Sequence, residues 1–158
     1  GGDSRTLGIL IGAGGFGELG AALTRGLQRH VMACVKHFAC NSMENARFSV
    51  DVQVDDVALH EVFLPHFRRV VDEGVAAVMS AYNSVNGEWC GQSRQLLTDV
   101  LRDEWGFEGF VVTDWGATAD RVQGLRAGID LEMPGPGNLN AAQIVAAVRS
   151  FDVRTAAF

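Results

Sequence analysis

The sequence predicts an α/β protein in which the strands of a parallel sheet alternate with helices. Short apolar, β-branched runs alternate along the chain with stretches that have the periodicity of amphipathic helices. The runs contain few alternating polar residues, which is typical of parallel strands that are buried on both faces. Of the 158 residues, 47% are hydrophobic and 20% are charged, which is enough apolar material for one core.

The first predicted strand, residues 7–11, is followed by the glycines Gly12, Gly14 and Gly17. Their G-x-G-x-x-G spacing after a strand resembles a dinucleotide-binding fingerprint, so an NAD(P)-binding protein is one alternative. That fingerprint requires an acidic residue at the end of the next strand to bind the ribose hydroxyls, and the sequence has Lys36 there. The other alternative is a glycine-rich turn that enters a helix.

The next segments form a predicted helix, strand and loop. Residues 18–30 have apolar positions at helical spacing and predict an amphipathic helix. Residues 31–35 predict a strand that leads into Lys36 and His37. The polar residues 41–51 predict a loop.

A second helix is predicted to begin at Asp55, a favoured capping residue, and to end at Gly74. Pro65 lies inside this helix and should divide or kink it, because proline lacks a backbone N–H. Residues 75–79 predict the next strand, and Asn86-Gly87 predicts a tight turn.

The rest of the chain continues the alternation of helix and strand. Ser93 is a candidate cap for a helix that ends at Gly106. The later elements are a strand at 109–113, a helix at 117–128, a short strand at 129–133 and a helix at 140–150 with Ile144, Val145 and Val148 directed inward.

The strand at residues 109–113 ends in Asp114, which is followed by Trp115. Ligands of α/β proteins bind at the carboxyl ends of the parallel strands, so this carboxylate is a candidate for chemistry. A carboxylate beside a large aromatic ring is suited to hold a sugar ring and to attack it. The alternative is that Asp114 only caps the helix that follows.

The other predicted strands also end in polar or aromatic residues, Lys36 and His37 after one and Met79 to Tyr82 after the next. Lys36 and His37 can donate hydrogen bonds to sugar hydroxyls. Tyr82 can hydrogen-bond and orient a carboxylate, and Trp115 can stack on the apolar face of a sugar. Each residue alone also has a structural explanation, in the core or over the edge of the sheet. The carboxyl ends of parallel strands meet at one edge, so we expect these groups to converge.

Charge and composition argue against several classes of protein. The formal net charge of −6 and the pI near 5.1 argue against nucleic-acid binding, which needs a basic face. No apolar run reaches the roughly 18–20 residues of a membrane span, and the N-terminus has no signal-peptide pattern. The localisation is left open. Cys34, Cys40 and Cys90 form no C-x-x-C pair, so neither a metal site nor a disulfide framework is indicated, and we expect Cys34 to be buried.

Residues 17–150 resemble glycoside hydrolase family 3, of the β-glucosidase type, in the second half of its N-terminal (β/α)8 barrel. The resemblance implies a TIM-like half-barrel that is completed by dimerisation or relaxed into an open sheet. The segments that carry it are Val-Lys-His-Phe at 35–38, Met-Ser-Ala-Tyr-Asn at 79–83, Asn-Gly at 86–87, Leu-Thr-Asp at 97–99, Trp-Gly-Phe-Glu-Gly-Phe-Val-Val-Thr-Asp-Trp-Gly at 105–116 and Ala-Gly-Ile-Asp-Leu-Glu-Met-Pro-Gly at 127–135.

The resemblance implies retaining hydrolysis of terminal β-D-glucosyl or related residues, with Asp114 as the catalytic nucleophile and no metal ion or organic cofactor. Arg47 follows Lys36 by 11 residues, in the loop where the family has a sugar-binding arginine. The residues implied to line the glycone site are Lys36, His37, Arg47 and Tyr82, with Met79 and Trp115 packed around them.

Residues 1–158 are expected to form a single truncated half-barrel domain, in which residues 1–16 do not match the family. The family's acid/base glutamate comes from a later domain, and Glu44, Glu88, Asp130 and Glu132 do not lie at positions that the family uses. We therefore expect weak or no hydrolysis by this chain alone. The alternative is a non-catalytic carbohydrate-binding or oligomerisation module.

Half a barrel exposes sheet edges and apolar surface. The expected partners are therefore a small carbohydrate and a second copy of the chain or a complementary barrel half, with no nucleic acid and no membrane.

Overall fold

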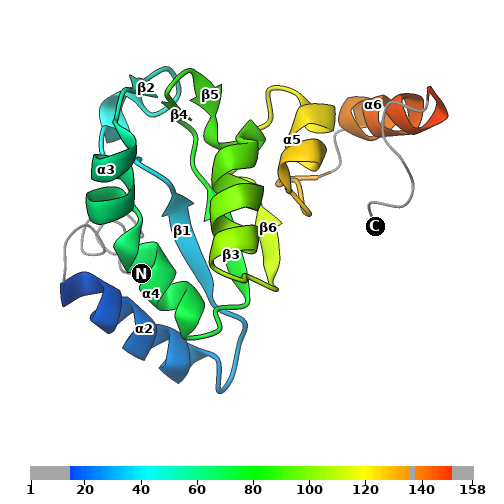
Figure 1. Ribbon diagram of the computed structural model, residues 1–158. Helices are drawn as coiled ribbons and strands as arrows, with labels where there is room; N and C mark the ends of the chain where they lie inside the picture. The colour runs from blue at the N-terminus through cyan, green and yellow to red at the C-terminus, as the bar shows by residue number, and fades with distance from the viewer. Residues whose placement is uncertain (1–14, 136–137, 151–158) are drawn as a thin grey trace.

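The computed structural model describes residues 15–135 and 138–150, and its centre is a parallel sheet (Figure 1). Within these residues the sheet has three strands, β1 (Cys34–Phe38), β3 (Ala77–Ser80) and β6 (Phe110–Val112), in the order β1-β3-β6. Both pairs are parallel, with Val35 opposite Val78. The predicted α/β class, with a parallel sheet and alternating helices, is confirmed.

The start of the chain is described only in part. The predicted strand at residues 7–11 lies outside the described residues, as do Gly12 and Gly14 of the glycine-rich motif. Helix α2 (Gly15–Leu27) begins earlier than predicted, so Gly17 lies in its first turns rather than in a turn before it. This glycine is part of a helix that packs on its neighbour.

Helix α2 packs along α4 (Pro65–Asp72), as Figure 1 shows. A Cβ atom on Gly17 would lie 3.2 Å from the Cβ of Arg69 and 3.3 Å from the Cα of His66. The absence of a side chain at Gly17 therefore lets the two helices approach closely.

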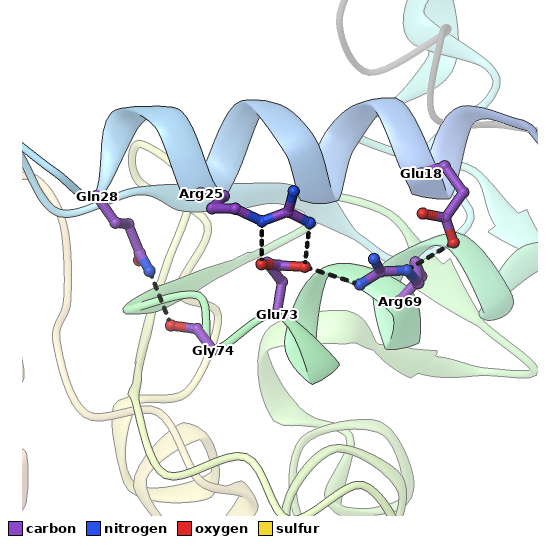
Figure 2. Close-up of polar contacts among 6 residues, drawn as sticks. All are labelled: Glu18, Arg25, Gln28, Arg69, Glu73 and Gly74. Atoms are coloured by element: carbon purple, nitrogen blue, oxygen red, sulfur yellow. Dashed lines mark hydrogen bonds and ion pairs between the residues drawn. The ribbon is translucent and has the colours of Figure 1, made fainter.

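Four charged side chains join α2 to α4 in one network (Figure 2). The Arg25 guanidinium donates to both carboxylate oxygens of Glu73, at 2.6 and 2.9 Å. Arg69 donates to Glu73 at 3.1 Å and to Glu18 at 2.7 Å. The two arginines lower the pKa of Glu73 to about 2, because both stabilise its ionised form.

Gln28 ties the end of α2 to the turn between α4 and β3 (Figure 2). Its side-chain amide donates to the carbonyl of Gly74 at 2.9 Å and accepts from the N–H of Ala76 at 2.8 Å. The amide thus satisfies two backbone groups at the point where the chain enters the sheet.

The helix predicted after residue 55 consists of α3 (Asp56–Ala58), the π-helical η2 (Leu59–Phe63) and α4. Asp55 caps it as predicted, and its carboxylate accepts from the N–H of Ala58 at 2.8 Å. Pro65 divides it, as predicted, because proline has no N–H to donate within the helix. Gly74, with φ of +81°, ends it.

A second small sheet lies beside the carboxyl ends of the central strands, at the top of Figure 1. It pairs β2 (Asp51–Val52) with β4 (Ser84–Val85), and β4 with β5 (Glu88–Trp89). The predicted turn at Asn86-Gly87 joins β4 to β5 with positive φ angles of 51° and 89°. This conformation suits a two-residue hairpin loop.

The other helical elements are η1 (Glu44–Ala46), η3 (Cys90–Gln92), η4 (Gln95–Glu104), α5 (Arg121–Ala127) and α6 (Asn138–Arg149). Ser93 caps the predicted helix, since its hydroxyl accepts from the N–H of Leu96 at 3.3 Å. Helix α5 begins later than predicted because Asp120 caps it, accepting from the N–H groups of Val122 and Gln123. Residues 117–120 are therefore free to form a loop at the carboxyl end of β6.

Four predictions were wrong, three of them in the outer parts of the sheet and one in the last helix. Residues 129–133 contribute only one isolated bridge, between Leu131 and Val112, instead of a strand. The strand predicted from residue 31 begins at Cys34, and Cys34 is exposed because successive side chains alternate between the two faces and Val35 takes the core side. In α6, Val145 is exposed rather than directed inward.

The core lies between the central sheet and the helices that cover it. Its fully buried side chains include Phe38, Leu59, Leu64, Val78, Leu96, Leu97, Leu101 and Val111. Among the described residues, no helix is both long and apolar enough to cross a membrane.

Candidate active site

Two side chains from the ends of β1 and β6 meet above the sheet. Nε2 of His37 lies 3.1 Å from Oδ2 of Asp114, and both side chains are largely buried, with 12% and 11% of their surface exposed. The N–H of Trp115 donates to the other carboxylate oxygen, Oδ1, at 2.7 Å. Both oxygens of Asp114 therefore have a polar partner.

The charge state of Asp114 follows from these contacts. Burial pushes its pKa upward, but the hydrogen bond from His37, the N–H of Trp115 and the positive charge of Lys36 outweigh that effect. The pKa of Asp114 is consequently below its usual value, so the group is an ionised carboxylate at neutral pH.

Asp114 does not cap the following helix. Helix α5 begins at Arg121, and Asp120 supplies its cap. The structural alternative considered for Asp114 is therefore wrong, and its carboxylate lies against His37 instead.

The segment that carries Asp114 is fixed from both sides by the chain after α5. The hydroxyl of Thr113 accepts from the N–H of Met133 at 2.8 Å. The backbone N–H of Thr113 donates to the carbonyl of Leu131 at 3.0 Å. Gly116, with φ of +72°, donates to the carbonyl of Met133 at 2.8 Å. Residues 131–133 hold Asp114 in place although they form no continuous strand.

Tyr82 follows β3 and lies over the same end of the sheet. Its hydroxyl donates to the carbonyl of Trp115 at 2.8 Å. Burial raises the pKa of the Tyr82 phenol, and the Asp114 carboxylate raises it further. The Tyr82 phenol thus lies beside the Asp114 carboxylate and is hydrogen-bonded to the next residue, Trp115.

Arg47 reaches this region from the loop after β1. Its Nη1 lies 2.7 Å from Oε2 of Glu44, and its guanidinium carbon lies 5.5 Å from the centre of the Tyr82 ring. The Nε atom of Arg47 is buried and has no hydrogen-bond partner among the described residues. Glu44 therefore holds Arg47 next to Tyr82.

The remaining predicted residues lie around this group. Lys36, in β1, is partly buried, and its charge acts on Asp114. Met79, in β3, is partly buried and pairs with Val112 of β6. The side chain of Trp115 is 54% exposed.

Two aromatic residues near Asp114 were missed by the sequence analysis. Phe48 packs edge-on against Tyr82, with ring centres 4.7 Å apart, and the Arg47 guanidinium lies 4.6 Å from its centre. Trp89, in β5, lines a pocket with Phe48, Tyr82 and Trp115. The signal that could have found Phe48 is its place directly after Arg47 in an otherwise polar loop.

Three of the four other carboxylates that were considered are paired with an arginine, and the fourth is exposed. Glu44 pairs with Arg47, and Glu88 lies exposed in β5. Asp130 accepts from Arg102 and from the N–H of Val111, both at 2.7 Å. Glu132 pairs with Arg121 at 3.5 Å. No cluster of metal-ligating side chains occurs in the part of the chain that the structure describes.

Comparison with known proteins identifies the family to which this chain is similar. The family model described as the glycosyl hydrolase family 3 N terminal domain matches residues 16–158. Thermostable beta-glucosidase B of Acetivibrio thermocellus is 48% identical over 135 residues, which are 84% of this chain and 18% of that protein. An exo-alpha-(1->6)-L-arabinopyranosidase of Bifidobacterium breve is 44% identical over 135 residues, again 84% of this chain and 18% of that protein.

Solved structures agree in fold. Beta-glucosidase 3B from Thermotoga neapolitana in complex with alpha-D-glucose superimposes with a TM-score of 0.86 at 39% identity, over 89% of this chain and 21% of that chain. Beta-glucosidase from Kluyveromyces marxianus in complex with glucose gives 0.86 at 37% identity, over 90% and 18%. The chain spans about a fifth of the length of these proteins. Its open sheet corresponds to part of a (β/α)8 barrel.

Proposed function

Because the chain belongs to glycosyl hydrolase family 3, we propose that it carries the nucleophile and the glycone-binding groups of a β-glucosidase-type retaining hydrolase. The observation that carries this proposal is the ionised Asp114 carboxylate at the end of β6, 3.1 Å from His37. A nucleophilic carboxylate has to be deprotonated and held in one orientation. The lowered pKa of Asp114 and the polar partners of both its oxygens meet these two requirements.

In the proposed reaction, an Asp114 oxygen attacks the anomeric carbon of the bound sugar. The bond to the leaving-group oxygen breaks as the glycosyl ester forms, and a general acid protonates that oxygen. Water then attacks the same carbon and gives a proton to the group that acted as general acid, which releases the sugar and restores the carboxylate. The configuration at the anomeric carbon is retained because it is inverted twice.

The glycone would be held by groups that can donate to sugar hydroxyls. Lys36, His37 and Arg47 supply cationic or imidazole N–H donors around the carboxylate. Tyr82 places a phenol beside them, and Met79 and Trp115 supply apolar surface.

The relatives support a β-glucoside as the substrate. Several matching proteins are named β-glucosidases, and several of the matching structures are described as complexes with glucose. Because a relative of similar identity is named an arabinopyranosidase, we propose terminal β-D-glucosyl or related residues as the substrate.

We propose that the chain is a slow catalyst by itself. Retaining enzymes place the two catalytic carboxyl groups about 5–5.5 Å apart. Among the described residues, the carboxylates of Glu44, Asp130 and Glu132 are engaged in ion pairs instead. The lack of a general acid typically costs about 10²–10⁴ in rate.

A carbohydrate-binding module without turnover is the second candidate, favoured by the ion pairs in which these carboxylates of the described residues are engaged. The separating test is hydrolysis of 2,4-dinitrophenyl β-D-glucoside, whose leaving group needs little protonation, with calorimetry of glucose binding in parallel. Release of dinitrophenolate that is abolished in Asp114→Ala supports catalysis. Equal rates for the parent and Asp114→Ala, with glucose binding intact, would leave the binding module.

A further inference from the structure

Asn83, in the segment that follows β3, is fully buried, with none of its surface exposed to solvent. Its side-chain amide donates to the carbonyls of Ala39 and Ser84, both at 3.2 Å, and Nδ2 lies 3.6 Å from Sγ of Cys90. Ala39 comes directly after β1, two residues beyond His37. Asn83 therefore ties the segment after β3 to the segment after β1.

The carbonyl of Ala39 has a second donor, the thiol of Cys90, at 3.4 Å. Burial raises the pKa of Cys90 to about 12, so this thiol keeps the proton that it donates. The N–H of Cys90 in turn donates to the carbonyl of Asn83 at 3.0 Å. A carbonyl oxygen has two lone pairs, so the two donors together fix the position of Ala39, with the thiol as the weaker of the two.

The contacts of Asn83 require a hydrogen-bond donor on one branch of its side chain. Nδ2 faces two carbonyl oxygens and a sulfur, whereas Oδ1 is buried and has no partner among the described residues. The opposite orientation of the amide would place Oδ1 against the two carbonyls, which only accept hydrogen bonds. A buried unpaired oxygen costs stability, and such departures from local rules gather at functional sites.

The segment that Asn83 holds also carries the imidazole that contacts Asp114. Nε2 of His37 lies 3.1 Å from Oδ2 of Asp114. A hydrogen bond is lost when its two heavy atoms are about 3.6 Å apart, so a displacement of this segment by about half an ångström breaks the contact. The position of the Ala39 carbonyl, two residues away, is therefore important for the contact.

We propose that Asn83 is a positioning residue for the reaction of Asp114 and that Cys90 assists it. The two side chains hold the Ala39 carbonyl, and they thereby keep the His37 imidazole within hydrogen-bond distance of the Asp114 carboxylate. Both are fully buried, so they act through His37 and not through the sugar. The inference rests on the proposed function and adds two residues that the proposed glycone site does not contain.

The titration of Asp114 reports the position of His37 without requiring turnover. The chain is isotope-labelled at its aspartate carboxyl carbons and titrated by NMR, and the signal of Asp114 is identified by its absence in Asp114→Asn. Lys36, whose charge also acts on Asp114, is kept in every other variant.

The expected result is a shift of the Asp114 titration to higher pH. Complete loss of a hydrogen bond to a charged group corresponds to about 1–2 pH units. Because the Cys90 thiol still holds Ala39, Asn83→Ala should move the midpoint by about half of that. Cys90→Ala, which removes the weaker donor, should produce a smaller shift in the same direction.

Two comparisons separate positioning from a general loss of stability. Ser93 is also buried, and its hydroxyl caps η4, so Ser93→Ala should lower Tm without moving the Asp114 titration. In a His37→Ala background, Asn83→Ala should produce no further shift, because the imidazole that Asn83 positions is absent.

An Asp114 midpoint in Asn83→Ala that matches the parent chain overturns the inference. An equal shift in Ser93→Ala, or a full additional shift in the His37→Ala background, overturns it as well. If Asn83→Ala does not fold, Cys90→Ala decides: an upward shift supports the inference, and an unchanged midpoint overturns it. A parent chain that releases no dinitrophenolate contradicts the proposed function alone, and the titration still decides whether Asn83 positions His37.

Discussion

Oδ2 of Asp114 and Nε2 of His37 lie 3.1 Å apart although their strands, β6 and β1, are separated in the sheet by β3. The two side chains therefore meet above the carboxyl end of β3. This contact between a carboxylate and an imidazole joins the two outer strands of the described sheet. It explains both why the pKa of Asp114 stays low despite burial and why the geometry of the site depends on the whole sheet.

The first prediction concerns that contact. In His37→Ala the carboxylate loses its hydrogen-bond partner while burial still disfavours its charge, so the pKa of Asp114 rises. The acid limb of the pH–rate profile for an activated aryl glucoside should move to higher pH. Loss of a hydrogen bond to a charged group predicts kcat/KM lower by about ten- to a hundredfold. An unchanged acid limb in His37→Ala would contradict this account of the charge on Asp114.

The second prediction concerns the ion-pair network of α2 and α4. The pKa of Glu73 is about 2 in the folded chain, below its ordinary value of 4.5, because of Arg25 and Arg69. A lowered pKa stabilises the fold above the unfolded value, and this contribution is lost as the pH falls from about 4.5 to about 2. Glu73→Gln should therefore lower Tm at neutral pH and have progressively less effect toward pH 2.

Thermal unfolding followed by circular dichroism over this pH range measures the effect. Glu108→Gln, which removes an exposed carboxylate outside the network, is the matched control and should shift Tm little at any pH. A difference between the parent and Glu73→Gln that is the same at pH 2 and pH 7 would argue against the network.

The third prediction compares two glycines of α2. Around Gly26 nothing lies within 4 Å of an added Cβ, so Gly26→Ala should stabilise the chain by about 0.5–1 kcal/mol. A Cβ at Gly17 would press on the backbone of α4, and overpacking costs about 1–3 kcal/mol, so Gly17→Ala should destabilise. Urea unfolding of both variants decides it, and equal stabilisation by both would show that Gly17 is not a packing residue.

The same glycine bears on the NAD(P) alternative. Since the close packing of α2 on α4 accounts for Gly17, no nucleotide is needed to explain it. Titration with NADPH should give no change in nucleotide fluorescence. A saturable change that is lost in Gly17→Ala would restore that alternative.

The fourth prediction concerns assembly. In the described sheet β1 is an edge strand, and Leu19, Leu23 and Leu27 of α2 are exposed. Open sheet edges and apolar stripes favour association, so we expect the isolated chain to form a dimer at micromolar concentration or to bind a complementary barrel half. Size-exclusion chromatography with light scattering measures the mass. Leu23→Lys should shift it toward the monomer, and a clean monomer of the parent chain would contradict the expectation.

Much of this architecture could be predicted from the sequence because it depends on local rules. As predicted, Asp55 caps a helix, Pro65 divides it and Gly74 ends it. The Asn86-Gly87 turn also has the expected conformation. The position of Asp114 at a strand end follows from the apolar run before it.

The remaining features depend on contacts between distant residues. The later start of α5 follows from its cap, Asp120, which lies six residues after Asp114. Cys34 is exposed because one face of an edge strand lacks a cover in the described residues, which the pattern of a buried run does not reveal. Phe48, after η1, and Trp89, in β5, are far apart in the sequence and line one pocket with Tyr82 only in the folded chain, so neither segment alone predicts it.

The central claim is that Asp114 is the nucleophile, and covalent trapping tests it most directly. 2,4-Dinitrophenyl 2-deoxy-2-fluoro-β-D-glucoside has a leaving group that needs no acid, and its fluorine slows hydrolysis of the glycosyl ester. After incubation and peptide mass spectrometry, we predict one fluoroglucosyl adduct on the peptide that contains Asp114, and none in Asp114→Asn. An adduct on a different carboxylate, or no adduct from a compound that binds, would contradict the account.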